Sequence, residues 1–176
     1  MDGSLDEWSR FERLTPFRVR EVLLIASQFD RYLLEESGHL AEILQEEYSV
    51  LNLSQAPRII HSPNAEDAID LVSSRRFDLV ITMSKVGRMD VYELARQLKE
   101  ISGNIPVVML SQNTRELATL RTGEGIDRIF VWSGDSRILL SICKLIEDEK
   151  NVENDVEEGD VQVILLVEDS RRFYSA

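Results

Sequence analysis

The chain has 176 residues, 43% of them hydrophobic and 30% charged, which is enough to bury one core and excludes a wholly disordered chain. Its 32 acidic and 20 basic residues give a net charge of −12, which disfavours nucleic acids and anionic membrane surfaces as partners. A single cysteine, Cys143, excludes an intrachain disulfide framework and favours a cytoplasmic location, and no apolar run reaches the roughly 18 residues of a membrane span.

Short apolar segments alternate with segments of helical periodicity along most of the chain. The pattern predicts, in chain order, strand 21–27, helix 30–48, strand 58–62, helix 64–74, strand 77–83, helix 90–101, strand 105–111, a weaker helix 114–121, strand 127–132 and helix 136–149. The strands are continuously apolar, which is typical of a parallel sheet covered by helices on both faces. Five such units predict a flavodoxin-like, doubly wound α/β fold, whose ligands bind beyond the carboxyl ends of the strands.

The segments that flank this pattern differ from it in composition. Residues 1–18 form a polar lead-in, residues 19–150 hold the alternating units, residues 151–160 form an acidic linker, and residues 161–176 begin a second unit. The window 147–160 contains eight acids and one lysine. Because like charges at this density repel one another and cannot bury apolar area, the window is predicted to be solvated.

Residues 21–150 resemble the receiver domain of bacterial response regulators. The segment FDLVITMSKVGRMDVYELARQLKE resembles that family's third strand, the loop after it and the third helix, and IPVVMLS resembles the fourth strand. The segment IDRIFVWSGDSRILLSICKLIEDE resembles the fifth strand and the last helix. The resemblance implies a CheY-like five-stranded fold and a signal-transduction role in a bacterial phosphorelay, or two-component, protein.

The tail of the chain carries a second resemblance. VILLVEDSRRFY repeats the register of VLLIASQFDRY and resembles the first strand of another receiver domain. Glu168 and Asp169 fall where that strand carries the metal-binding acids of the family. The resemblance therefore implies that residues 161–176 are the start of a second receiver, whose acids would bind a metal only in a complete domain.

Receiver chemistry needs a phosphate-accepting aspartate, carboxylates that hold a divalent cation, and a hydroxyl and a lysine that contact the phosphoryl group. The resemblance places the acid pair on Ala26 and Ser27, the acceptor on Met83, the hydroxyl on Ser111 and the lysine on Trp132. Of these positions, only Ser111 keeps a matching residue. The sequence thus predicts a degenerate receiver, or pseudo-receiver, that is not an enzyme and holds no metal or cofactor in its first domain.

A domain of this kind is expected to act through protein contacts. The partner would be another domain of the same polypeptide, a separate signalling protein or a second copy in a homodimer. In the receiver family, partners meet the face made by the fourth helix, the fifth strand and the fifth helix. Its candidate residues here are Arg115, Leu117, Arg121 and Ile129, the last of which stands where the family has its switch aromatic.

Several alternatives stay open from the sequence. A pocket at the strand ends, lined by Ala26, Met83 and Trp132, would suit a small apolar ligand and make the domain a small-molecule sensor. Lys85 and Arg88, in the loop after the third strand, either attract an anion or are simply solvated. A second alternative is an active receiver that uses unorthodox residues for phosphoryl transfer. A third is the N-terminal regulatory part of a larger enzyme, such as a histidine kinase or a phosphoenolpyruvate-utilising protein.

Overall fold

The computed structural model describes residues 14–36, 45, 48, 56–159 and 163. Most of the predicted lead-in, the second half of the predicted first helix, and Glu168 and Asp169 in the tail lie outside these residues. The elements are β1 (Glu21–Ile25), α2 (Gln28–Glu36), β2 (Arg58–Ser62), α4 (Ala65–Ser74), β3 (Leu79–Met83), α5 (Val91–Ser102), β4 (Val107–Ser111), the 3-10 turn η1 (Glu116–Ala118), β5 (Arg128–Val131) and α6 (Ile138–Gly159).

The five strands form one parallel sheet in the order β2-β1-β3-β4-β5. This order is that of a doubly wound fold, and it confirms the predicted flavodoxin-like, CheY-like architecture. All residues of β3 and β4 are buried, as their continuous apolar sequences predict. Because every strand runs in the same direction, all carboxyl ends meet at one edge of the sheet, between the layers of helices.

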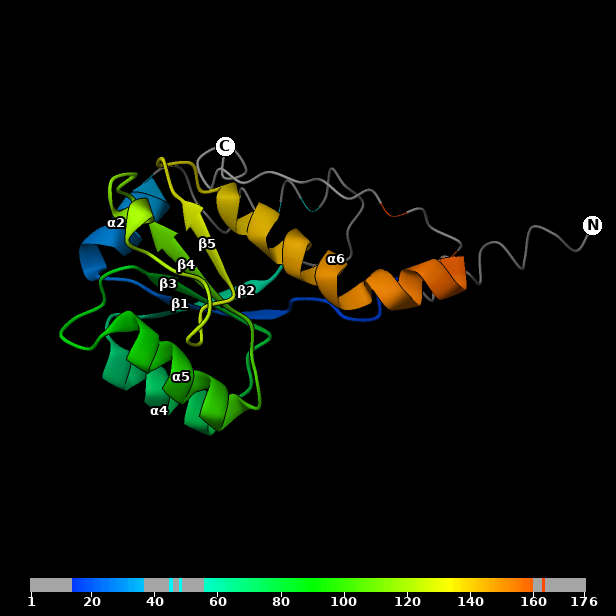
Figure 1. Ribbon diagram of the computed structural model, residues 1–176, viewed down its shortest axis with the longest axis horizontal. Helices are drawn as coiled ribbons and strands as arrows, with labels where there is room; N and C mark the ends of the chain where they lie inside the picture. Colours follow the sequence, from blue (N-terminus) through cyan, green and yellow to red (C-terminus); the bar gives the residue numbers. More distant parts are fainter. Residues whose placement is uncertain (1–13, 37–44, 46–47, 49–55, 160–162, 164–176) are drawn as a thin grey trace, which may run out of the picture.

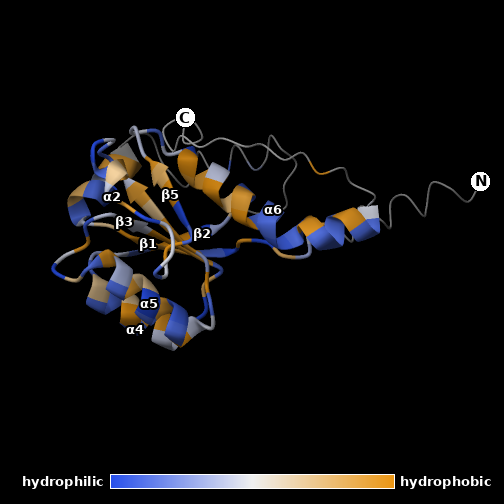
Figure 2. Ribbon diagram, in the orientation of Figure 1, coloured by the Kyte–Doolittle hydropathy of each residue, from blue (hydrophilic) through white to orange (hydrophobic). Residues whose placement is uncertain are grey.

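Helices cover both faces of the sheet. In Figure 1, α4 and α5 lie together on one face, and α2 and α6 lie on the other. Figure 2 shows the apolar residues of the sheet enclosed between these two layers. The largest fully buried side chains come from strands and helices alike: Leu23, Ile25, Leu34, Leu79, Ile81, Leu94, Leu98, Met109, Leu110, Ile126 and Ile129.

Two helices are capped by the residues at which their predicted ranges begin, Asn64 and Asp90. The Asn64 side chain accepts a hydrogen bond from the backbone N–H of Asp67, and Asp90 accepts from the N–H groups of Tyr92 and Glu93. These bonds satisfy donors that the first helical turn leaves without partners. At the other end, α5 stops at Gly103, whose φ of 69° lies in the left-handed region that glycine adopts at low cost.

The predicted helix over residues 114–121 is wrong, because the structure has only the 3-10 turn η1 there. The carbonyl of Glu116 accepts from the N–H of Thr119 at 2.9 Å and of Leu120 at 3.1 Å, and it also accepts from the Thr119 hydroxyl at 2.7 Å. A hydroxyl that competes for the helical acceptor weakens a helix. The segment also has too few apolar side chains to be held as a longer helix by packing.

The predicted end of the last helix at residue 149 is also wrong, because α6 continues to Gly159 through most of the predicted acidic linker. The charge pattern suggested repulsion and solvation. However, Glu147 and Asn151 are buried, and they bond to the backbone of residues 17–19. Contacts distant in sequence therefore outweigh the local repulsion between acids.

Candidate functional site

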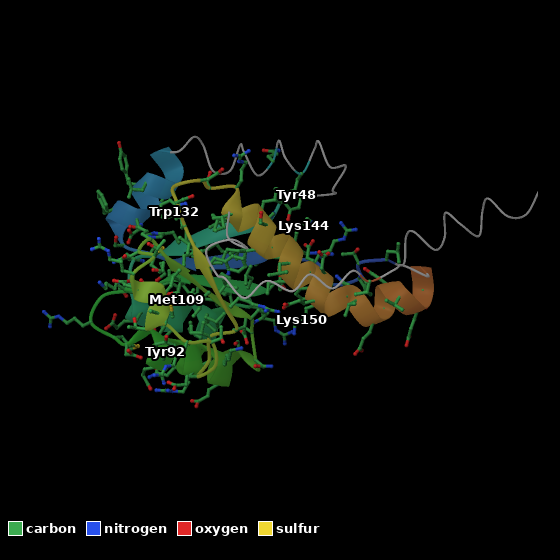
Figure 3. All side chains as sticks on the ribbon, turned by 45° about the horizontal axis from the view of Figure 1, so that its top comes forward. Tyr48, Tyr92, Met109, Trp132, Lys144 and Lys150 are labelled. Atoms are coloured by element: carbon green, nitrogen blue, oxygen red, sulfur yellow. The ribbon has the colours of Figure 1, made fainter. Side chains whose placement is uncertain are left out.

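The structure brings the residues of the predicted degenerate site to the carboxyl edge of the sheet. Ala26 follows β1, Met83 ends β3, Ser111 ends β4 and Trp132 follows β5. Ala26 and Ser111 are fully buried, and Met83 and Trp132 each expose 4% of their surface. These side chains are thus part of the domain's core at this edge, and Trp132 lies beyond the end of β5 in Figure 3.

The two polar groups among these buried residues bond within their own loops. The Trp132 indole Nε1–H donates to the carbonyl oxygen of Asp135 at 3.1 Å. The Ser111 hydroxyl accepts from the N–H of Asn113 at 3.2 Å and donates to its carbonyl oxygen at 3.3 Å. Such local bonds shape the loops that follow β4 and β5.

A hollow of about 340 Å³ opens at the same edge. It is lined by Asp30, Met83, Ser84, Lys85, Gln112, Asn113 and Glu116. Of the three residues of the predicted apolar pocket, Met83 lines this hollow and is the one apolar residue in its lining, whereas Ala26 and Trp132 are buried and do not line it. The small residue Ala26 and the bulky Trp132 fill the core, and the polar loops surround the space above it.

One carboxylate of the hollow, Asp30, joins two loops. Its Oδ2 accepts from the Ser27 hydroxyl at 2.7 Å, and the Ser27 oxygen accepts in turn from the Asp30 N–H at 3.1 Å. Its Oδ1 accepts from Gln112 Nε2 at 3.0 Å. Asp30 therefore links the beginning of α2 to the loop after β4.

The other carboxylate of the lining, Glu116, joins η1 to the loop after β3. Lys85 Nζ lies 2.8 Å from Glu116 Oε1, and the Ser84 hydroxyl donates to Oε2 at 3.4 Å. The bond from Lys85 is the main cause that lowers the pKa of Glu116, and the same bond raises the pKa of Lys85. Lys85 is thus paired with a carboxylate of its own chain, an arrangement that the sequence interpretations did not include.

The residues at this edge do not fit a divalent cation of the kind that receiver chemistry uses. Such ions take several oxygen ligands at 2.0–2.6 Å, and Ala26 and Met83 bring no side-chain oxygen. Among the described residues, no group of three or more His, Cys, Asp or Glu is placed to hold a metal ion. On β2, His61 donates from Nε2 to the carbonyl oxygen of Ala26 at 2.7 Å.

The predicted partner-binding residues have different environments. Arg115 and Arg121 are exposed, and Leu117 is half-buried against the core. Ile129 is fully buried in β5, where it pairs in register with Met109, and so it is wrong as an interface residue. The apolar sequence of β5 places Ile129 in the core.

Asp30, Gln112, Asn113 and Glu116 form most of the hollow, but the sequence did not single them out as site residues. One signal was present: a serine three residues before an acid, as in Ser27 and Asp30, is typical of a helix start. The remaining pairs join different loops and have no local signature. Among the described residues, no helix is long and apolar enough to cross a membrane.

Neither a family model nor a curated protein matches the sequence. Solved structures do match. A signal receiver domain of an HD domain-containing protein from Pseudomonas fluorescens Pf-5 is 23% identical with a TM-score of 0.53, covering 79% of this chain and 94% of that one. A CheY-like receiver domain from Methanospirillum hungatei JF-1 is 17% identical with a TM-score of 0.58, covering 77% and 98%.

A response regulator from Thermotoga maritima in complex with Mg²⁺ and BeF is 18% identical with a TM-score of 0.51, covering 72% of this chain and 98% of that one. An adenylate cyclase structure from Rhodopirellula baltica is 13% identical with a TM-score of 0.54, covering 80% and 98%. These likenesses show that the chain has the fold of receiver domains. The chain spans nearly the whole length of each of these structures.

Proposed function

We propose that this chain is a receiver-like regulatory domain of a bacterial two-component protein that signals through protein contacts and does not accept a phosphoryl group. The observation that carries the proposal is Met83. It ends β3 and is 96% buried, so a thioether occupies the position that the resemblance assigns to the acceptor carboxylate. A thioether bears no negative charge and offers no oxygen to a phosphoryl group or a cation.

The polar groups of the hollow support the same proposal. Asp30 bonds to Ser27 and Gln112, and Glu116 bonds to Lys85 and Ser84, so both carboxylates already have partners. These bonds join the segment after β1 to the loop after β4, and the loop after β3 to η1. We infer that side chains hold this edge of the domain in one arrangement, without a ligand, and that a partner recognises that fixed surface.

The proposal includes protein partners, no enzymatic activity, no cofactor and a cytoplasmic location. The partner is another domain of the same polypeptide, a signalling protein or a second copy of this chain. Arg115 and Arg121, both exposed near η1, are the proposed contact residues. Reversing both charges is expected to weaken a dimer formed by this face, and sedimentation that does not change in the double variant would remove the face from the proposal.

Phosphoryl acceptance is tested directly by mass spectrometry. The protein is incubated with acetyl phosphate and magnesium, and the intact mass is measured under conditions that preserve acyl phosphates. No adduct of about 80 Da is expected. The triple variant Ala26→Asp, Ser27→Asp and Met83→Asp, which restores the three acids, serves as the comparison. A stable adduct on the unmodified chain would refute the proposal.

The hollow favours one alternative function, the sensing of a small polar ligand. Its volume of about 340 Å³ falls within the size range of small-molecule sites, and its lining is mostly polar. A polar compound that raises the melting temperature of the protein, but not that of an Asp30→Asn variant, would favour this function over one based on protein contacts alone.

A further inference from the structure

A second set of side-chain bonds joins the two ends of the described domain. We call residues 14–19 the N-terminal strap and residues 147–159 the α6 extension. Alternate backbone N–H groups of the strap donate to side chains spaced four apart on the helix, in the pairs Thr15–Asp155 at 2.8 Å, Phe17–Asn151 at 2.8 Å and Val19–Glu147 at 2.9 Å. Because β1 begins just after the strap, this contact lies toward the amino edge of the sheet, opposite the hollow.

The spacing of the acceptors matches the spacing of the donors. Four residues of an α-helix rise about 6 Å, and two residues of an extended chain span about 6.6 Å. Thr15, at the outer pair, departs from an extended backbone with a φ of 53°. Asn151, at the centre, is 1% exposed and pairs with both backbone groups of Phe17, accepting from its N–H and donating to its carbonyl oxygen at 2.8 Å. The Asn151 side chain thus satisfies both backbone hydrogen-bonding groups of Phe17, as a neighbouring β-strand would.

The apolar side chains of the α6 extension bury little of their surface among the described residues. Val152 and Val156 are 39% and 41% exposed, and Figure 1 shows this end of α6 projecting past the sheet. Its last turn contains no basic residue, so acids lie at the helix end where the dipole disfavours negative charge. In proteins, most of the stability of a helix comes from its tertiary contacts. The bonds to the strap are therefore tertiary contacts that stabilise the extension.

We propose that the N-terminal strap and the α6 extension form one two-state element, in which the two segments dock and are released together while the sheet stays folded. Release of the strap, for example by a protein that binds residues 14–19, unwinds the extension. Unwinding of the extension releases the strap, because coupling between two segments is reciprocal. This element connects the two ends of the domain and does not involve the hollow or a phosphoryl group.

The test is hydrogen exchange, read by mass spectrometry on the full chain. In an Asn151→Ala variant, the amide hydrogens of residues 15–19 and 150–159 are both expected to exchange about 30-fold faster, while those of β4 are unchanged. This factor is the net effect of losing the two hydrogen bonds between Asn151 and the backbone of Phe17. Glu153→Ala, at an exposed position of the same helix, is the matched control and should not accelerate exchange. Since alanine is a better helix former than asparagine, helix propensity alone predicts slower exchange in residues 150–159.

A Phe17→Ala variant tests the reciprocal direction, because Phe17 packs against the core and its loss weakens the strap without altering the helix. Faster exchange of residues 150–159 is expected. Acceleration confined to the segment that carries the substitution, in either variant, would overturn the coupling. A loss of protection that extends equally to β3 and β4 would also overturn it, because strap and extension would then unfold only with the sheet.

Discussion

Gly125 lies in the turn before β5, and its backbone packs directly against α5. The turn is closed by two hydrogen bonds between Gly123 and Ile126, at 2.7 and 2.9 Å. A Cβ atom on Gly125 would lie 2.8 Å from the backbone nitrogen of Arg96 and 2.9 Å from the carbonyl carbon of Ala95. Contacts this short with backbone atoms cannot be relieved by rotating a side chain, so Gly125→Ala is expected to force the turn and α5 apart.

The magnitude follows from comparison with Gly123. Both glycines have positive φ angles, 97° for Gly125 and 94° for Gly123, but a Cβ on Gly123 would have no heavy atom within 4 Å. Gly123→Ala thus measures the backbone conformation alone, at a cost of about 1–2 kcal/mol. Gly125→Ala adds an overpacking cost of about 1–3 kcal/mol. We expect it to lower the free energy of unfolding by about 2 kcal/mol more than Gly123→Ala does.

The assay is urea unfolding of both variants and the unmodified chain, followed by far-ultraviolet circular dichroism. The difference between the two variants isolates the contact with α5, because the conformational cost is common to both. Equal losses of stability in Gly125→Ala and Gly123→Ala would show that the backbone of Gly125 does not lie as close to α5 as this account requires.

Three further predictions concern the edge of the sheet and the core. Met83→Asp places a carboxylate at a buried position and should lower the free energy of unfolding by about 2–4 kcal/mol in urea titrations, whereas Met83→Leu should cost less than about 1.5 kcal/mol; equal costs would contradict this account. Titration with magnesium to millimolar concentrations should leave tryptophan fluorescence unchanged, and a saturable quench would argue for a cation site near Trp132. Burial raises the pKa of the Cys143 thiol from 9.0 to about 12, so between these values the unfolded chain loses a proton that the folded chain keeps, and stability should fall as the pH rises. The unfolding midpoint of Cys143→Ala should decline less steeply over this range, and identical slopes would show that the thiol does not contribute.

The sheet and most helices were predictable because their signals are local. The structure has β2 at Arg58–Ser62, the range predicted from its apolar run, and α4 and α5 start after the capping residues Asn64 and Asp90. The strand ends that form the site were predictable for the same reason, since the carboxyl ends of parallel strands share an edge. Each of these inferences needed only a few adjacent residues.

The errors arose where the deciding partner is distant in sequence. Glu147 lies in a run of acids that predicts a solvated segment, but it accepts a backbone bond from a residue 128 positions earlier. Asp30 and Gln112, which are 82 residues apart, meet only because two loops fold toward each other. The helix predicted over residues 114–121 is an exception, because there the competing bond is local: the Thr119 hydroxyl donates to the carbonyl of Glu116, three residues earlier. The spacing of apolar residues along the sequence carries no information about such contacts.

The bonds between the strap and the extension also determine the order in which parts of the domain can fold during synthesis. The three bonds join residues 140, 134 and 128 positions apart. At about 5–20 residues per second, the ribosome adds some 130 residues in roughly 6 to 26 seconds, so Thr15, Phe17 and Val19 are made that long before their partners. During this interval the sheet can assemble from β1 to β5, whereas the strap must wait. Docking of the strap on the extension is therefore a late folding step, which can occur only after α6 has been synthesised.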